Sequence, residues 1–200
     1  LTVRPAPQPD VDFEYVIHNA DGGEVEQCGN GARCIARLVA SRVADRERML
    51  ALDSPGGIVN ARLRADGLVS VAMGVPDFRP ASLPFEAPEE APGYSVSLPG
   101  GPVEFGAVSV GNPHAVIRVR SVKDAPVDSV GPAMENHPRF PRRVNVGFLE
   151  IVAPDHVRLR VYERGVGETL SCGTGACAAV VTGIQSGLLD PNVLVHTQGG

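Results

Sequence analysis

The sequence predicts a mixed α/β fold made of two similar domains, each with its strands gathered around one helix. Three observations support this class. One ten-residue pattern occurs twice, both halves contain the alternating apolar and polar residues that are typical of strands, and each copy of the pattern precedes the clearest helical periodicity of its half. Of the 200 residues, 43% are hydrophobic and 20% are charged, so we expect a packed core.

The repeated pattern is Gly-Glu-x-x-x-Cys-Gly-[Asn/Thr]-Gly-Ala, which fits residues 23–32 and 167–176. Six of the ten positions are identical, and the two cysteines, Cys28 and Cys172, are 144 residues apart. Solenoid proteins repeat at much shorter periods. Two copies at this distance therefore predict two related domains.

The first half predicts a helix followed by a hairpin. Apolar residues recur at helical spacing over 31–43. Alternating residues over 58–63 and 68–73 then flank an Ala-Asp-Gly turn at 65–67.

A proline-rich stretch follows this hairpin, with prolines at 76, 80, 84, 88 and 92. This density excludes a helix and a central strand. We interpret the stretch as a connection and place the boundary near Val75. The predicted organisation is an N-terminal domain over 1–74 and a C-terminal domain over 75–200.

The second half predicts several strands, one helix and a final strand that runs into a glycine turn at 193–200. The strands are expected over 103–110, 115–119, 144–152 and 157–162. The helix follows the second cysteine motif over 176–184 and is apolar nearly all round. Cys34 and Cys177 fall inside the two predicted helices, where we expect buried structural thiols.

Charge and cysteine spacing exclude several classes of protein. The net charge of −5 argues against a partner that is a nucleic acid or an anionic membrane. No apolar run is long enough to span a bilayer, which favours a cytoplasmic protein. The four cysteines form two widely separated pairs with x5 and x4 spacings, which disfavours a disulfide framework and a structural zinc site, so no metal is expected.

Cys28 and Cys172 each stand just before a predicted helix N-terminus. There the free N–H groups and the helix dipole favour an anion, either a thiolate or a ligand carboxylate. If two such thiols face one carbon from opposite sides, one can remove a proton while the other returns one, which inverts a stereocentre without a metal or pyridoxal cofactor. The paired motifs thus make a cofactor-independent proton transfer possible.

Four ordered segments resemble the motifs of the diaminopimelate epimerase family: residues 19–34, 111–114, 143–148 and 163–177. The resemblance implies two pseudo-symmetric barrels, each around a central helix, with the site between them. It also implies interconversion of LL- and meso-diaminopimelate, a small-molecule substrate, in lysine and peptidoglycan precursor synthesis, with no cofactor. The oligomeric state stays open, with a homodimer as one candidate.

The same resemblance implies roles for individual residues. Cys28 and Cys172 would be the two acid/base thiols, and His114 and Glu163 would tune their surroundings. The backbones of Gly29, Asn30, Gly173 and Thr174 would hold the reacting carboxylate. The distal amino-acid end of the substrate would be bound by Asn19, Asn112, Asn145, Glu163 and Arg164. Apart from the family, Asn112 is also a good turn residue, and Asn145 could point to solvent from a strand.

The sequence also departs from the family pattern, because no Gly-Leu-Gly-Asn-Asp-Phe segment opens it and no closing strand follows the final glycines. We therefore expect a fragment that is inactive or weakly stable by itself. Three alternatives stay open: a proline racemase or hydroxyproline epimerase, a non-catalytic amino-acid-binding protein, and a thiol-redox protein. The first usually carries His after the first Cys-Gly, where this chain has Asn30, and the last usually shows Cys-x-x-Cys.

Overall fold

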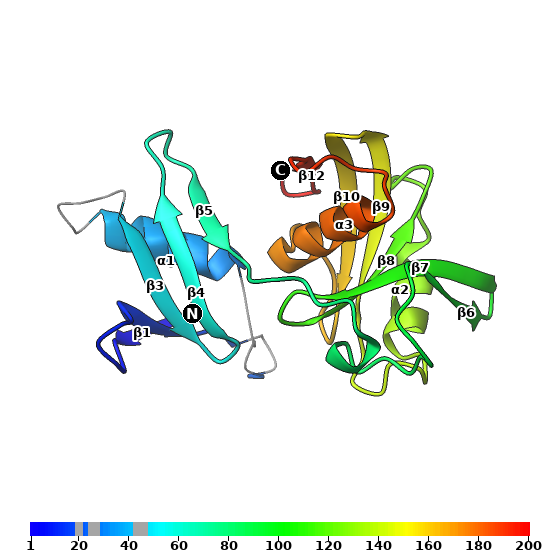
Figure 1. Ribbon diagram of the computed structural model, residues 1–200, viewed down its shortest axis with the longest axis horizontal. Helices are drawn as coiled ribbons and strands as arrows, with labels where there is room; N and C mark the ends of the chain where they lie inside the picture. Colours follow the sequence, from blue (N-terminus) through cyan, green and yellow to red (C-terminus); the bar gives the residue numbers. More distant parts are fainter. Residues whose placement is uncertain (19–21, 24–28, 42–47) are drawn as a thin grey trace. The chain divides into compact units, whose positions relative to one another are not determined.

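The computed structural model describes residues 1–18, 22–23, 29–41 and 48–200. The chain separates into two compact units, Leu1–Gly74 and Val75–Gly200. Each has its own sheet and its own apolar core (Figure 1). Among the described residues no helix has the length and apolarity of a membrane span.

The first unit is a five-stranded sheet with α1 packed against it. In chain order its elements are β1 Thr2–Pro5, β2 Phe13–Val16, α1 Gly29–Ala40, β3 Met49–Ser54, β4 Gly57–Leu63 and β5 Val69–Ala72. The strands are hydrogen-bonded in the order β1-β2-β3-β4-β5, and β2 and β3 run parallel.

The stripe Ala32, Ile35, Ala36 and Val39 of α1 is buried against Leu50, Leu52, Val59 and Ala61 of the sheet. These helix positions follow the i, i+3, i+4, i+7 spacing of one helix face. The predicted helix and the hairpin of β4 and β5 are confirmed.

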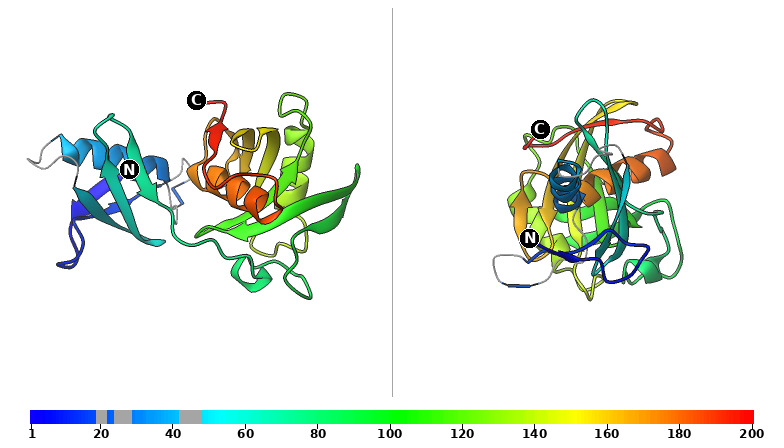
Figure 2. Two further views of the ribbon diagram at one scale, coloured as in Figure 1. Left: turned by 45° about the horizontal axis from the view of Figure 1, so that its top comes forward. Right: turned by 90° about the vertical axis from the view of Figure 1, so that its left-hand side faces the viewer.

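The second unit is a sheet covered on both faces. Its elements are η1 Pro80–Ser82, β6 Tyr94–Leu98, β7 Gly101–Ser109, β8 Pro113–Arg118, α2 Val127–Glu135, β9 Asn145–Ala153, β10 His156–Glu163, β11 Gly167–Thr169, α3 Gly173–Gln185 and β12 Leu194–His196. The strand order is β11-β10-β9-β8-β7-β6, and β12 pairs with β10. Figure 2 shows α3 lying across this sheet.

Successive residues of the central strand β8 enter different cores. Ala115 and Ile117 pack in the core that contains Val127 and Met134 of α2, whereas Val116 packs in the core that contains Ala178 of α3. Side chains alternate between the faces of a strand, so a strand covered on both sides is apolar throughout. β8 is accordingly buried from Pro113 to Ile117.

The mixed α/β class is confirmed, and so are the predicted positions of β7 to β10, α3 and β12. Within the described residues no pairing joins the two ends of either strand order, so each sheet is open where the resemblance implied a closed barrel. The proline-rich stretch does more than connect, because Leu83 and Phe85 are buried in the core beside α2.

The helix α2 escaped prediction because Gly131 and Pro132, both helix-weakening residues, lie inside it. Tertiary packing explains the glycine. A Cβ added at Gly131 would lie 2.6 Å from Cγ of Tyr162 on β10, so only glycine lets helix and strand approach this closely.

Candidate active site

Cys172 occupies the N-cap of α3, the residue just before the helix begins. Its backbone is extended, with φ −127° and ψ 113°, and its Sγ accepts a hydrogen bond from the backbone N–H of Gly175 at 3.4 Å. A Cβ added at Gly175 would lie 2.9 Å from Cγ2 of Val161. A side chain at position 175 would collide with β10, so glycine here lets the first turn of α3 pack closely against that strand and the Cys172 sulfur. An N-cap acceptor favours negative charge, and here that acceptor is the sulfur.

A chain of hydrogen bonds leads from the Cys172 sulfur to a buried histidine. Thr174 Oγ1 lies 3.4 Å from Cys172 Sγ, and Asn112 Nδ2 donates to Thr174 Oγ1 at 3.3 Å. Asn112 Oδ1 lies 3.0 Å from His114 Nε2. Because the amide oxygen can only accept, the neutral imidazole carries its proton on Nε2 and the hydroxyl hydrogen of Thr174 is available to the sulfur. The N–H and O–H groups of His114, Asn112 and Thr174 thus all donate in the direction of Cys172.

Burial is the main cause of the pKa shifts of Cys172 and His114, the two ends of this series of hydrogen bonds. Burial raises the pKa of the Cys172 thiol to about 12; the negative charge of Glu163 adds to this effect, whereas the hydrogen bonds from Thr174 and Gly175 oppose it. Burial, followed by the positive charge of Arg164, lowers the pKa of His114 to about 3. At neutral pH the site holds a protonated thiol and a neutral imidazole, whose Nδ1 has no hydrogen-bond partner among the described residues.

Asn145 connects two segments of the site from a buried position on β9. Its Nδ2 donates to the carbonyl of Pro113 at 2.9 Å, and its Oδ1 accepts from the backbone N–H of Arg164 at 3.0 Å. The suggestion that this amide simply points to solvent is wrong, since Asn145 is 4% exposed. The guanidinium of Arg164 donates from Nη1 to the carbonyl of Arg142 at 3.3 Å.

The second unit thus brings together most of the residues expected to form the site: Asn112, His114, Asn145, Glu163, Arg164, Cys172, Gly173 and Thr174. Cys28 and Asn19 lie outside the described residues. Gly29 and Asn30 form the first turn of α1, where Asn30 Oδ1 accepts a hydrogen bond from Arg33.

The prediction that Cys34 is a buried thiol is wrong, because this side chain is exposed. It lies two positions beyond Ala32, which at 100° per residue places it opposite the buried stripe of α1. Cys177 is partly buried and packs against the core under α3.

One residue near the thiol was missed by the sequence analysis. Thr169 Oγ1 donates to Glu163 Oε1 across the hairpin of β10 and β11. It lies within the repeated pattern, but at a position where the two copies differ, so the pattern itself gave no reason to select it.

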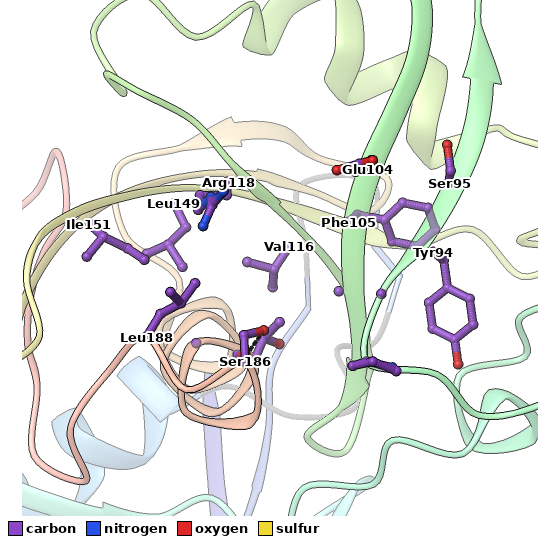
Figure 3. Close-up of a pocket in the computed structure, with 15 residues that line it drawn as sticks. Tyr94, Ser95, Glu104, Phe105, Val116, Arg118, Leu149, Ile151, Ser186 and Leu188 are labelled. Carbon is purple, nitrogen blue, oxygen red and sulfur yellow. Dashed lines mark hydrogen bonds between the residues drawn. The ribbon is translucent and has the colours of Figure 1, made fainter.

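Two pockets of the second unit lie away from Cys172 and the other expected site residues. One of about 630 Å³ is lined by β6 to β9 and the end of α3, including Phe105, Val116, Leu149 and Leu188 (Figure 3). None of the expected site residues lines it. In the described part of the chain, no three His, Cys, Asp or Glu side chains converge as a metal site requires.

Comparison with known proteins places this sequence in a family. The sequence pattern of the family described as Diaminopimelate epimerase matches residues 1–79 and 106–200. The chain is 56% identical to the diaminopimelate epimerase of Chromobacterium violaceum and 54% identical to that of Stutzerimonas stutzeri, over all 200 residues and 72% of each relative's length.

A solved hydroxyproline epimerase from Agrobacterium vitis shares the fold, with a TM-score of 0.72 at 20% identity, over 99% of this chain and 62% of that protein. This likeness concerns the fold alone, whereas the likeness in sequence to the diaminopimelate epimerases extends over the whole chain. The structural likeness agrees with the mixed α/β architecture of the two sheet units. The chain belongs to the diaminopimelate epimerase family.

Proposed function

We propose that this chain is the catalytic part of an epimerase that interconverts LL- and meso-diaminopimelate, with Cys172 and Cys28 as the two acid/base thiols. The observation that carries the proposal is the position of the Cys172 sulfur. It accepts from Gly175 N–H at the start of α3, lies beside the Thr174 hydroxyl, and is held near the Glu163 carboxylate. These are the surroundings that a group alternating between thiol and thiolate requires.

The reaction balances as two proton transfers. One thiolate takes the α-proton from the substrate carbon, the electron pair passes into the neighbouring carboxylate, and the opposite thiol delivers its proton to the other face of the carbon. The substrate is inverted, and the two sulfurs have exchanged protonation states. Backbone N–H groups at the start of a helix stabilise the extra charge on the carboxylate. Gly173 and Thr174 supply them in our proposal.

In one direction of the reaction Cys172 acts as the acid, and in the reverse direction it acts as the base. As an acid it needs only the proton that its raised pKa retains at neutral pH. As a base it must first lose that proton, and the Glu163 carboxylate is the adjacent acceptor. Cys28 takes the matching role in our proposal through the repeated motif. A cytoplasmic location and a homodimer stay predictions.

Proton NMR of LL-diaminopimelate in heavy water tests the proposal. The chain covers 72% of the length of its relatives, so exchange is measured with a version extended to their full length beside the chain itself. We expect the extended version to exchange the α-proton for deuterium, and Cys172→Ala in it to slow exchange by about 100-fold or more, the contribution of a general acid/base group. Cys177→Ala, in the same helix but away from the N-cap, is the matched control and should keep exchange within about threefold.

Other outcomes would overturn the proposal in distinguishable ways. Binding of diaminopimelate without exchange, unchanged in Cys172→Ala, would indicate a binding protein. Racemisation of proline with no exchange of diaminopimelate would indicate the related racemase activity.

A further inference from the structure

Glu163 and Thr169 face each other across the hairpin of β10 and β11. Val161 pairs with Thr169 and Glu163 pairs with Gly167, so Glu163 and Thr169 are diagonal neighbours on one face of the two strands. Val161 identifies that face, because its Cγ2 lies under Gly175 in the first turn of α3. The pair is therefore on the side of the hairpin that carries the Cys172 thiol.

The contacts connect the three side chains in one order. Thr169 Oγ1 donates its proton to Glu163 Oε1, and the negative charge of the Glu163 carboxylate acts on the Cys172 thiol, whose pKa it raises. Threonine is stiff at χ1 because it is β-branched, whereas a partly buried glutamate has several rotamers to choose among. The hydroxyl on the strand is thus the fixed partner, and the carboxylate is the group that it holds.

The repeated motif provides an independent observation. With the constant offset of 144 residues between the two copies, Glu163 corresponds to Asn19 and Thr169 corresponds to Val25. The copy without the carboxylate also lacks the hydroxyl. The two positions differ together between the copies, as expected for a pair that works as a unit and belongs to Cys172 alone.

We propose that Thr169 is a positioning residue, whose hydroxyl holds the Glu163 carboxylate against Cys172 so that the thiol proton has one fixed acceptor. The proposal rests on the proposed function for its catalytic consequence. The position of the Glu163 charge near the Cys172 thiol can be measured separately, by an experiment that does not require catalytic activity.

The test compares Thr169→Val, which removes the hydroxyl at nearly constant volume, with Thr169→Ser, which keeps it. We expect Thr169→Val to lower kcat for α-proton exchange about tenfold while KM changes by less than about twofold, since in our proposal this hydroxyl acts through Glu163 and not on the substrate. Thr169→Ser should stay near the unaltered chain. Thr197→Val, which removes a hydroxyl that bonds the Gly200 carbonyl, is the matched control and should change neither value.

A second readout follows alkylation of Cys172 by iodoacetamide as a function of pH, with the modified peptide quantified by mass spectrometry. Because the Glu163 charge raises the pKa of Cys172, Glu163→Gln should move the midpoint to lower pH. A carboxylate released from Thr169 should have a weaker effect, so Thr169→Val should shift the midpoint in the same direction. In the double variant the Thr169 change should add nothing, because the charge that it positions is gone.

The outcomes separate the two proposals. Absence of α-proton exchange in the version extended to the length of the relatives would overturn the proposed function, while the alkylation series would still decide the role of Thr169. Equal midpoints for the unaltered chain and Thr169→Val, or a shift that persists fully on the Glu163→Gln background, would overturn the positioning role. A folded Thr169→Val variant that loses kcat and is not rescued by Thr169→Ser would also overturn it, because loss of packing would then be the cause.

Discussion

Nε2 of His114 lies 3.0 Å from Oδ1 of Asn112, and this contact determines which ring nitrogen of the buried histidine carries the proton. Asn112 in turn reaches Thr174, so the imidazole and the Cys172 thiol belong to one hydrogen-bonded chain. Both ends are uncharged at neutral pH, with the pKa of His114 lowered to about 3 and that of Cys172 raised to about 12. At neutral pH the site therefore holds a protonated Cys172 thiol near the Glu163 carboxylate.

The first prediction concerns the dependence of stability on pH. His114 stays neutral in the folded chain down to about pH 3 but binds a proton below about pH 6.5 when unfolded. Between these values the unfolded state holds more protons, so the free energy of unfolding falls as the pH is lowered, by up to about 1.4 kcal/mol per pH unit. Urea unfolding from pH 7 to pH 4 measures this slope.

His114→Gln should reduce that slope, whereas His137→Gln, at a partly exposed histidine outside the core, should leave it in place. An unchanged slope in His114→Gln would show that another group causes the acid sensitivity.

The second prediction concerns the buried amide of Asn145. Asn145→Ala removes a donor from the Pro113 carbonyl and an acceptor from the Arg164 N–H, and leaves both groups unpaired in the interior. We expect a loss of about 2 to 4 kcal/mol in the free energy of unfolding. Asn136→Ala removes a single exposed bond to the Pro132 carbonyl and should cost below about 1 kcal/mol. Equal losses in the two variants would contradict the linking role of Asn145.

The third prediction concerns the close approach at the start of α3. Gly175→Ala would gain up to about 1 kcal/mol of helix propensity, but its Cβ would lie 2.9 Å from Val161, which forces strand and helix apart at a cost of about 1 to 3 kcal/mol. The shift also moves the N–H that Cys172 accepts from, so we expect the alkylation midpoint of Cys172 to change. Gly100→Ala has open space around it and should alter neither quantity.

The fourth prediction concerns the ion pair that braces β11. Arg160 donates from Nε to Glu168 Oε1 at 2.6 Å and from Nη2 to Glu168 Oε2 at 2.8 Å, and both side chains are less than a quarter exposed. Glu168→Gln should therefore cost about 1 to 3 kcal/mol of unfolding free energy. The matched variant Glu14→Gln breaks a more exposed single contact with Arg4 and should cost below about 1 kcal/mol. Thermal unfolding of the two variants decides between these expectations.

Local patterns predicted those parts of the fold whose sequence preference agrees with their structure. The apolar stripe of α1, the turn between β4 and β5, and the strands β7 to β10 all show their periodicity directly. The helix α2 could not be predicted in this way, because Gly131 is required by contact with Tyr162, a residue 31 positions away. Burial in the cores likewise overrides the prolines around Leu83 and Phe85.

The sequence by itself determined the family, because membership depends on residue identities at fixed spacing, and the same spacing predicted two related halves and selected Cys172 as a candidate thiol. Only the tertiary structure decided the electrostatic state of that thiol and the hydrogen-bond chain through Thr174 and Asn112 to His114. It also revealed the contact of Thr169 with Glu163. Burial, hydrogen-bond direction and the pairing of a strand edge depend on what surrounds a residue in space, and no single stretch of chain contains that information.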